Sequence, residues 1–219
     1  MFGRRQKPAA EPAAPAPDPS DAEDVALMLR AAADDLAAFS ALVRKHERHL
    51  ANFFSRNGVL RDVEDLAQLT FLKLHRMRRG YRPTAKFTTF LYLLARQVLV
   101  DHVRASQRRA RLHEAAGKEM DATEPAPRHR GEAEDVQAAL ASLSPALRET
   151  VVLVVMQGLA YHEAAEVLRV PVGTVKSRVS AALRQMKEFL SDSPPSPCAA
   201  TRGARAPGAG PSSCGPRPR

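Results

Sequence analysis

Apolar residues recur at helical spacing through the middle of the chain, and no run shows the strict apolar–polar alternation of a half-buried strand. In the first half, apolar stripes cover residues 36–43, 63–74 and 87–103. Breaks between these helices are expected near Gly58 and over residues 79–83, where glycine, arginine and proline interrupt the pattern. We therefore predict an all-α fold.

Further helices are expected in the C-terminal half. Ser144 followed by Pro145 is typical of a helix start, because serine caps the first turn and proline fits its first position. Gly158 is expected to end the helical run that follows. Residues 161–168 then predict a short helix, and residues 169–171 a tight turn before the last helix.

The last helix has two different faces at 100° per residue. Its apolar face carries Val175, Val179, Ala182 and Met186. The opposite face carries Ser177, Ser180 and Arg184, with Thr174 and Lys176 on the flanks. This pattern predicts one face packed inward and one facing solvent.

The pattern divides the chain into two small folded units. Residues 21–105 and 135–190 form the predicted domains, and residues 106–134 form a flexible linker because they lose the apolar pattern. The ends, residues 1–20 and 191–219, contain five and seven prolines with little that can be buried, so we expect both to be disordered.

The composition limits the classes of partner that the chain is expected to bind. Lys and Arg number 33 against 24 Asp and Glu, an excess of +9 that attracts polyanions such as nucleic acid or an anionic membrane. The chain has neither a signal-peptide core nor 18 apolar residues in a row, so we expect no membrane insertion and a cytoplasmic protein. Cys198 and Cys214 lie in the proline-rich tail and are interpreted as incidental.

The short helix, turn and last helix together are typical of a helix-turn-helix, whose second helix enters the major groove of DNA. Lys176, Arg178 and Arg184 add positive charge beside the free N–H groups of the helix start. The alternative is a solvated basic face on a packing helix. The motif by itself indicates DNA binding and not what the binding achieves.

A basic segment precedes it. Between Lys73 and Arg111 there are eleven Lys or Arg residues and a single acid, Asp101, and aromatic residues are interleaved with them. Cations follow a phosphate backbone and aromatic faces stack on unpaired bases, so this composition suits single-stranded DNA. The alternative is that Phe87, Phe90 and Tyr92 are core residues.

One predicted helix begins with acids on an otherwise basic chain. Asp62, Glu64 and Asp65 precede its apolar residues. The helix macrodipole stabilises acidic side chains at a helix start, and this effect alone is sufficient to explain them. An acidic and apolar face is also a plausible docking surface for a protein partner.

Enzyme-like patterns are weak. Residues 162–166, His-Glu-Ala-Ala-Glu, resemble a zinc-protease helix but lack the second histidine. His46 and His49 share a helix face without an identifiable carboxylate or thiol partner. We expect no metal site, no cofactor, no small-molecule substrate and no catalysis.

Three ordered blocks resemble the extracytoplasmic-function (ECF) sigma factors of the sigma-70 family. Residues 62–74 resemble region 2.2, the helix that grips the clamp of core RNA polymerase. Residues 87–104 are similar to regions 2.3 and 2.4, which recognise and open the −10 promoter element. Residues 143–178 match region 4, the helix-turn-helix that reads the −35 element. Phe90 and Gln97 depart from the family's usual Trp and Asn, so melting contacts differ in detail.

The resemblance implies an alternative sigma factor that directs promoter-specific initiation, with core RNA polymerase, promoter DNA and an anti-sigma factor as partners. It implies polymerase contacts by Asp62, Glu64, Asp65, Leu66, Gln68, Phe71 and Leu74. It implies −10 binding and melting by Tyr81, Arg82, Lys86, Phe87, Thr89, Phe90, Arg96, Gln97, Asp101 and Arg104. It implies −35 contacts by Thr174, Lys176, Ser177, Arg178, Ser180, Ala181 and Arg184.

Two rival classes remain open at this point. A stand-alone helix-turn-helix regulator explains residues 144–188 but leaves the acidic helix and the first basic domain without a role. A nucleic-acid enzyme requires a metal or carboxylate constellation that the sequence does not show. Dependence of promoter binding on core polymerase separates the first rival from a sigma factor.

Overall fold

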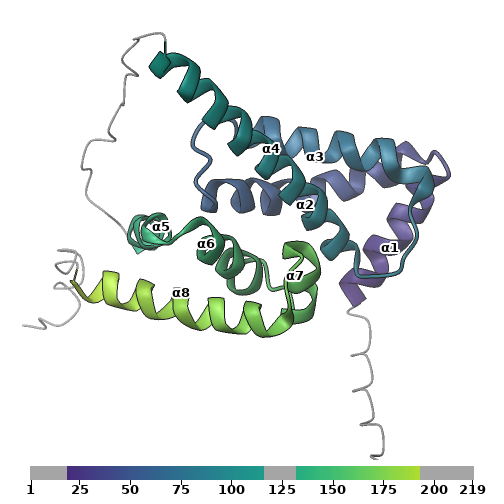
Figure 1. Cartoon of the computed structure of the whole chain (residues 1–219). Coiled ribbons are helices and arrows are strands. Elements are labelled where there is room, and N and C mark those ends of the chain that lie inside the picture. Colours follow the sequence, from purple (N-terminus) through teal and green to yellow (C-terminus); the bar gives the residue numbers. More distant parts are fainter. Residues whose placement is uncertain (1–18, 116–131, 193–219) are drawn as a thin grey trace, which may run out of the picture.

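The computed structural model describes residues 19–115 and 132–192, and within these ranges every regular element is a helix, as predicted. The first group comprises α1 (Pro19–Ala32), α2 (Leu36–Arg56), α3 (Val63–Met77), the 3-10 turn η1 (Arg78–Gly80) and α4 (Phe87–Ala115). The second comprises α5 (Glu132–Ser142), α6 (Pro145–Val151), the π-helical turn η2 (Val152–Met156), α7 (Tyr161–Leu168) and α8 (Val172–Asp192). Figure 1 shows α5 to α7 lying between α8 and the first group.

Local signals in the first group account for the helix ends. The Asp35 carboxylate accepts hydrogen bonds from the backbone N–H groups of Ala37 and Ala38, both at 3.0 Å, and so caps the start of α2. α2 ends just before Gly58, whose φ of +91° lies in the left-handed region that glycine adopts without strain. The predicted break over residues 79–83 is also present, because η1 gives way to extended backbone at Tyr81.

The second group also starts and stops where its residues predict. α6 begins at Pro145 after Ser144, although the Ser144 side chain makes no capping hydrogen bond. η2 continues α6 and the run ends at Gly158, which has a φ of +74°. The short helix predicted over residues 161–168 coincides with α7.

The long helix α4 extends further than its apolar stripe. The stripe ends near Val103, but the helix continues to Ala115, into the segment interpreted as linker. Residues 106–109 are polar and exposed, so no core requires them. Arginine, glutamine and alanine nevertheless have good intrinsic helix propensity, which allows an exposed extension without an apolar face. Of the rest of the expected linker, residues 116–131 lie outside the described residues, and residues 132–134 already belong to α5.

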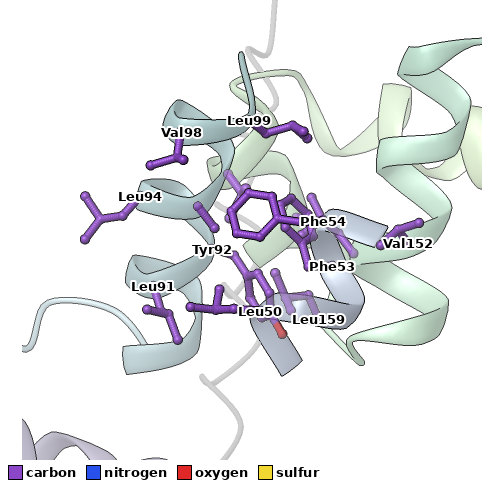
Figure 2. Close-up of a cluster of buried hydrophobic side chains, with 14 of the residues drawn as sticks. Leu50, Phe53, Phe54, Leu91, Tyr92, Leu94, Val98, Leu99, Val152 and Leu159 are labelled. Carbon is purple, nitrogen blue, oxygen red and sulfur yellow. The ribbon is translucent and has the colours of Figure 1, made fainter. Parts of the chain in front are cut away.

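One hydrophobic cluster joins the two groups of helices. In Figure 2, Phe53 and Phe54 of α2 and Tyr92 of α4 lie beside Val152 and Leu159 of the second group. The Phe53 ring lies 5.4 Å from Phe54 and 5.5 Å from Tyr92, within the range of favourable aromatic pairs. The two predicted domains therefore share part of their core in this conformation.

A buried ionic cluster ties α1 to α2. Asp24 is 1% exposed and its carboxylate lies 2.6 Å from Lys45 Nζ and 2.9 Å from His46 Nε2. The sequence interpretation that His46 has no carboxylate partner is therefore wrong, because the partner comes from α1, 22 residues earlier in the chain. Burial lowers the pKa of His46, against the opposing attraction of Asp24.

The ends of the described segments lie slightly inside the tails predicted to be disordered, since α1 begins at Pro19 and α8 ends at Asp192. The remainder of both tails, including Cys198 and Cys214, lies outside the described residues. Among the helices of residues 19–115 and 132–192, none combines the length and apolar character needed to span a bilayer.

Candidate nucleic-acid and polymerase interfaces

The two faces of α8 are separated as its sequence predicts. Val175, Val179 and Ala182 are buried at 0%, 5% and 0% exposure. Helix α8 packs against α5, α6 and α7. The opposite face exposes Lys176, Ser177, Ser180 and Arg184, while Thr174, Arg178 and Ala181 are half-buried. The first turns of α8 thus present small polar and basic side chains to solvent.

The turn before α8 is fixed by backbone geometry. Arg169 has a φ of 55° and a ψ of 48°, the left-handed conformation that often follows a helix and that non-glycine residues adopt at some cost. The Val170 N–H donates to the carbonyl of Ala165 at 3.1 Å, which closes the end of α7. The helix-turn-helix geometry is therefore formed even though arginine occupies a position where glycine would fit without strain.

Two charged residues of α6 and α7 support this unit. The Arg148 guanidinium donates to the carbonyls of Leu140, Ala141 and Leu143 and so holds the end of α5. The Glu163 carboxylate, on a residue that is 5% exposed, accepts from the Ala160 N–H at 2.8 Å at the start of α7. Glu163, which lies in the segment that resembles a zinc-protease helix, therefore caps the start of α7.

The residues predicted to contact the −10 element fall into three classes of burial. Arg82, Gln97, Asp101 and Arg104 are exposed. Tyr81, Lys86, Phe90 and Arg96 are half-buried, and Phe87 and Thr89 are buried at 0% and 3% exposure. Of the three aromatic residues in the core interpretation, Phe87 and Tyr92 are buried at 0% and 4% exposure, and Phe90 is half-buried. The exposed members of the predicted set are accessible to a ligand.

Phe87 organises the start of α4. Its backbone N–H donates to the Asp21 carboxylate at 2.8 Å, a long-range cap supplied by α1. Its ring lies 5.3 Å from the His46 ring and 6.4 Å from that of Tyr81. Tyr81 in turn lies 5.4 Å from Phe90, so the two half-buried aromatic residues form a pair beside the buried one.

Two of the predicted DNA-binding cations are paired with acids of the second group. Lys86 Nζ lies 2.9 Å from Glu163 Oε1, and Arg96 Nε lies 2.9 Å from Glu149 Oε1. Burial raises the pKa of the Glu149 carboxyl, and the attraction of Arg96 and Arg178 opposes that rise. Glu149 and Glu163 were not identified from the sequence as site residues, because a single carboxylate carries no local signal of a partner far away in the chain.

The acidic helix α3 presents a mixed surface. Of its predicted polymerase contacts, Glu64, Asp65 and Gln68 are exposed and Asp62 is half-buried. Leu66, Phe71 and Leu74 are buried and hold α3 in the bundle.

Two further leucines of α3 are exposed. The pattern placed Leu69 and Leu72 in an apolar stripe, yet they are 49% and 51% exposed. They line a shallow pocket of about 300 Å³ between α3 and α4 with Val98 and His102. An acidic edge beside exposed leucines is a surface suited to a protein partner.

Comparison with protein families identifies both halves. The sigma-70 region 2 family model matches residues 42–109, and the sigma-70 region 4 family model matches residues 133–186. The first range runs from within α2 to within α4 and omits α1, and the second runs from the start of α5 into α8.

Relatives that align with most of the chain lead to the same family. The ECF RNA polymerase sigma factor SigE of Mycolicibacterium smegmatis is 34% identical over 185 residues, which cover 80% of this chain and 70% of that protein. The ECF RNA polymerase sigma factor SigC of Mycobacterium tuberculosis is 32% identical over 182 residues, covering 80% of this chain and 95% of that protein. The ECF RNA polymerase sigma-E factor of Escherichia coli is 30% identical over 168 residues, covering 71% and 88%.

Solved structures share the fold. CnrH, in complex with the cytosolic domain of CnrY, superposes with a TM-score of 0.61 at 28% identity and covers 78% of this chain and 99% of that one. The sigma factor RpoE of Bartonella quintana, in complex with the anti-sigma factor NepR, gives a TM-score of 0.59 at 24% identity, covering 71% and 98%. The chain therefore belongs to the ECF RNA polymerase sigma factors of the sigma-70 family, and it is an alternative sigma factor that directs transcription initiation.

Proposed function

We propose that this sigma factor binds core RNA polymerase through α3, captures and opens the −10 element with the start of α4, and reads the −35 element with α8. The observation that carries the proposal is the exposed polar face of α8, with Lys176, Ser177 and Arg184 opposite the buried Val175 and Val179. A helix that follows a tight turn and exposes a polar face is the element that a helix-turn-helix places in the major groove.

Polymerase docking is assigned to one edge of α3. Glu64, Asp65 and Gln68 are exposed there, and Leu69 and Leu72 add apolar surface that the helix bundle leaves uncovered. Apolar side chains surrounded by polar ones are the usual composition of a protein interface. The buried members of the predicted set, such as Phe71, act by holding this edge in place.

The −10 surface is assigned to the region from Tyr81 to Arg104. The half-buried pair Tyr81 and Phe90 offers aromatic faces on which an unstacked base can rest. Arg82 and Arg104 are exposed and supply charge for the backbone phosphates. Unstacking a base costs a few kcal/mol, and a surface that accepts the base offsets that cost.

We further propose that the protein has no catalytic role of its own, acts in the cytoplasm and is held by an anti-sigma factor. The last point is supported by RpoE of Bartonella quintana, which shares this fold and was solved in complex with the anti-sigma factor NepR.

Run-off transcription tests the proposal. Genomic DNA fragments are transcribed by purified core RNA polymerase with and without this protein, and discrete start sites that appear only with the protein are expected. Specific duplex binding by the protein alone, without new transcripts, would instead favour the stand-alone operator-binding regulator.

A matched pair of lysines on α8 tests the −35 assignment. Lys176→Ala is expected to weaken binding of duplex promoter DNA and to reduce the salt slope by about 1, because one phosphate contact is lost. Lys187→Ala removes the same charge from an exposed position three turns further along α8 and serves as the control. Equal losses for both variants would reduce the assignment to general electrostatic attraction.

A further inference from the structure

A pocket of about 350 Å³ lies between α4 and the end of α7. Three arginines line it, Arg96 and Arg104 from α4 and Arg169 from the turn after α7. Arg104 follows Arg96 by about two helical turns, so both side chains extend from neighbouring positions on one face of α4. The packing of α7 against α4 therefore gathers three guanidinium groups from two helices around one space.

The positive charge of this pocket is only partly compensated. Arg96 Nε contacts Glu149 Oε1 at 2.9 Å. Asp101, an acid in the lining, lies 3.5 Å from Lys73 of α3. Among the residues that the structure describes, no carboxylate pairs with Arg104 or Arg169, and both residues are exposed. Two guanidinium groups of the lining therefore have donors that an anion can occupy.

The backbone at Arg169 is a second, independent sign that its side chain has a role. Its φ of 55° and ψ of 48° are left-handed, a conformation that glycine adopts without strain and that arginine adopts at some cost. Strained residues of this kind are concentrated at binding sites, where contacts with a ligand offset the strain. The strained position carries a cation, and that cation lines the pocket.

The rest of the lining suits an organic phosphate. Leu93 and Val100 are half-buried and add apolar surface beside the guanidinium groups, and the exposed Gln97 adds an amide that both donates and accepts. Arginine binds phosphate oxygens through parallel N–H donors, so two arginines match two adjacent phosphate groups. The volume lies at the lower end of the range for small-molecule sites, about 300–1,000 Å³.

We propose that the pocket between α4 and α7 binds a diphosphate group, either as free pyrophosphate or as part of a nucleotide. Arg104 and Arg169 hold the phosphate groups, and a nucleotide places its sugar or base against Leu93 and Val100. The site goes beyond the proposed function, which gives Arg104 to promoter DNA and no role to Arg169.

Isothermal titration calorimetry of the full chain with sodium pyrophosphate tests the site. Arg104→Gln and Arg169→Gly each remove one guanidinium, and each should weaken binding by about tenfold, the effect of losing one charge-assisted contact. Arg109→Gln removes the same charge from an exposed position of α4 outside the pocket. This control should change the Kd by less than about twofold.

The glycine variant also separates binding from folding. Glycine fits the left-handed turn at residue 169, so the Tm of Arg169→Gly should not fall while pyrophosphate binding is weakened. Circular dichroism checks that each variant is folded. If Arg169→Gly unfolds, Arg104→Gln decides, because its position is exposed.

A second titration with ADP distinguishes the two sources of the diphosphate group. Equal affinities for ADP and pyrophosphate identify the phosphates alone as the recognised group, and tighter binding of ADP adds contacts to the sugar or base. Both results support the site.

Three results overturn the proposal. They are no binding of either compound by the wild-type protein at millimolar concentration, full affinity in both pocket variants, and an equal loss in Arg109→Gln, which would indicate general attraction of anions. Run-off transcription by the wild-type protein with core polymerase is measured separately, because its failure rejects the proposed function and leaves the calorimetric result for the free chain unaffected.

Discussion

Helices α4 and α8 are both long and both assigned to promoter DNA, yet they are positioned differently. α8 is covered on one side, and Lys176, Ser177 and Arg184 are exposed on the other. α4 is covered by α1, α2 and α3 on one side and by α7 on another, so Phe87 and Thr89 are buried. A helix with one neighbouring layer shows its functional face in its sequence pattern, and a helix between two layers does not.

The difference has a physical cause. On α8, Val175, Val179 and Ala182 form a single stripe, so every position opposite them faces water. On α4, the side facing the second group carries Tyr92 and Arg96, which combine apolar surface with polar ends. Such side chains can be buried with a partner or exposed with a ligand, and periodicity cannot distinguish the two states.

The largest expected effect contrasts one buried and one exposed member of the predicted DNA set. Phe87→Ala should lower the free energy of unfolding by about 3–5 kcal/mol, because a large ring is removed from full burial. Lys176→Ala should change it by no more than about 0.5 kcal/mol while weakening DNA binding. Urea unfolding measures both values, and a stable Phe87→Ala protein would place that ring at the surface.

The second-largest expected effect concerns the ionic cluster that joins α1 to α2. Asp24→Ala should lower the free energy of unfolding by about 1–3 kcal/mol, since it leaves the buried His46 ring and the Lys45 ammonium without their shared carboxylate partner. Glu47→Ala, which removes an exposed acid from α2 next to His46 in the sequence, is the control. A similar small change for both variants would mean that the ionic cluster does not hold α1 in place.

Much of the fold followed from sequence because local signals agree with it. α7 lies where periodicity and Gly158 placed it, and the faces of α8 are those that 100° per residue predicts. The apolar stripe of α3 is also evident in the sequence, but its pattern does not tell which of its leucines are buried. A stripe that includes Leu69 and Leu72 is wider than the bundle covers, and only the packed structure shows which leucines remain outside.

Several contacts that sequence reasoning missed join segments far apart in the chain. Asp24 meets His46 across 22 residues, and Glu149 meets Arg96 across the gap between the two domains. Periodicity describes one helix at a time, so it contains no information about which charged residue of another helix will face it. The same limit applies to Asp21, which caps α4 from α1.

A pH effect follows from His46. Burial lowers the pKa of this imidazole, so the native state favours its neutral form. The corresponding stability is present above the ordinary pKa of about 6.5 and is lost as the pH falls through the lowered value. The charged groups that act on it are Asp24, Lys45 and His49.

Thermal melts between about pH 7 and pH 5 measure this loss. The wild-type Tm should fall on acidification, and His46→Gln should show a shallower fall because it takes up no proton there. His162→Gln removes an exposed imidazole of α7 that does not act on His46 and is the control. An unchanged slope in His46→Gln would show that the acid sensitivity arises elsewhere.

The smallest expected effect compares helix caps in the two domains. Asp35 accepts two backbone N–H groups at the start of α2 and is also bound by Arg30 at 2.7 Å, whereas the Ser144 side chain makes no capping hydrogen bond at the start of α6. Asp35→Ala should therefore lower the Tm measurably, because two N–H groups lose their acceptor. Ser144→Ala should change the unfolding free energy by less than about 0.5 kcal/mol, since Pro145 already satisfies the first position without a donor. Equal losses from both substitutions would mean that Ser144 caps α6 in solution, and the start of the second domain would then depend on its cap as the first domain does.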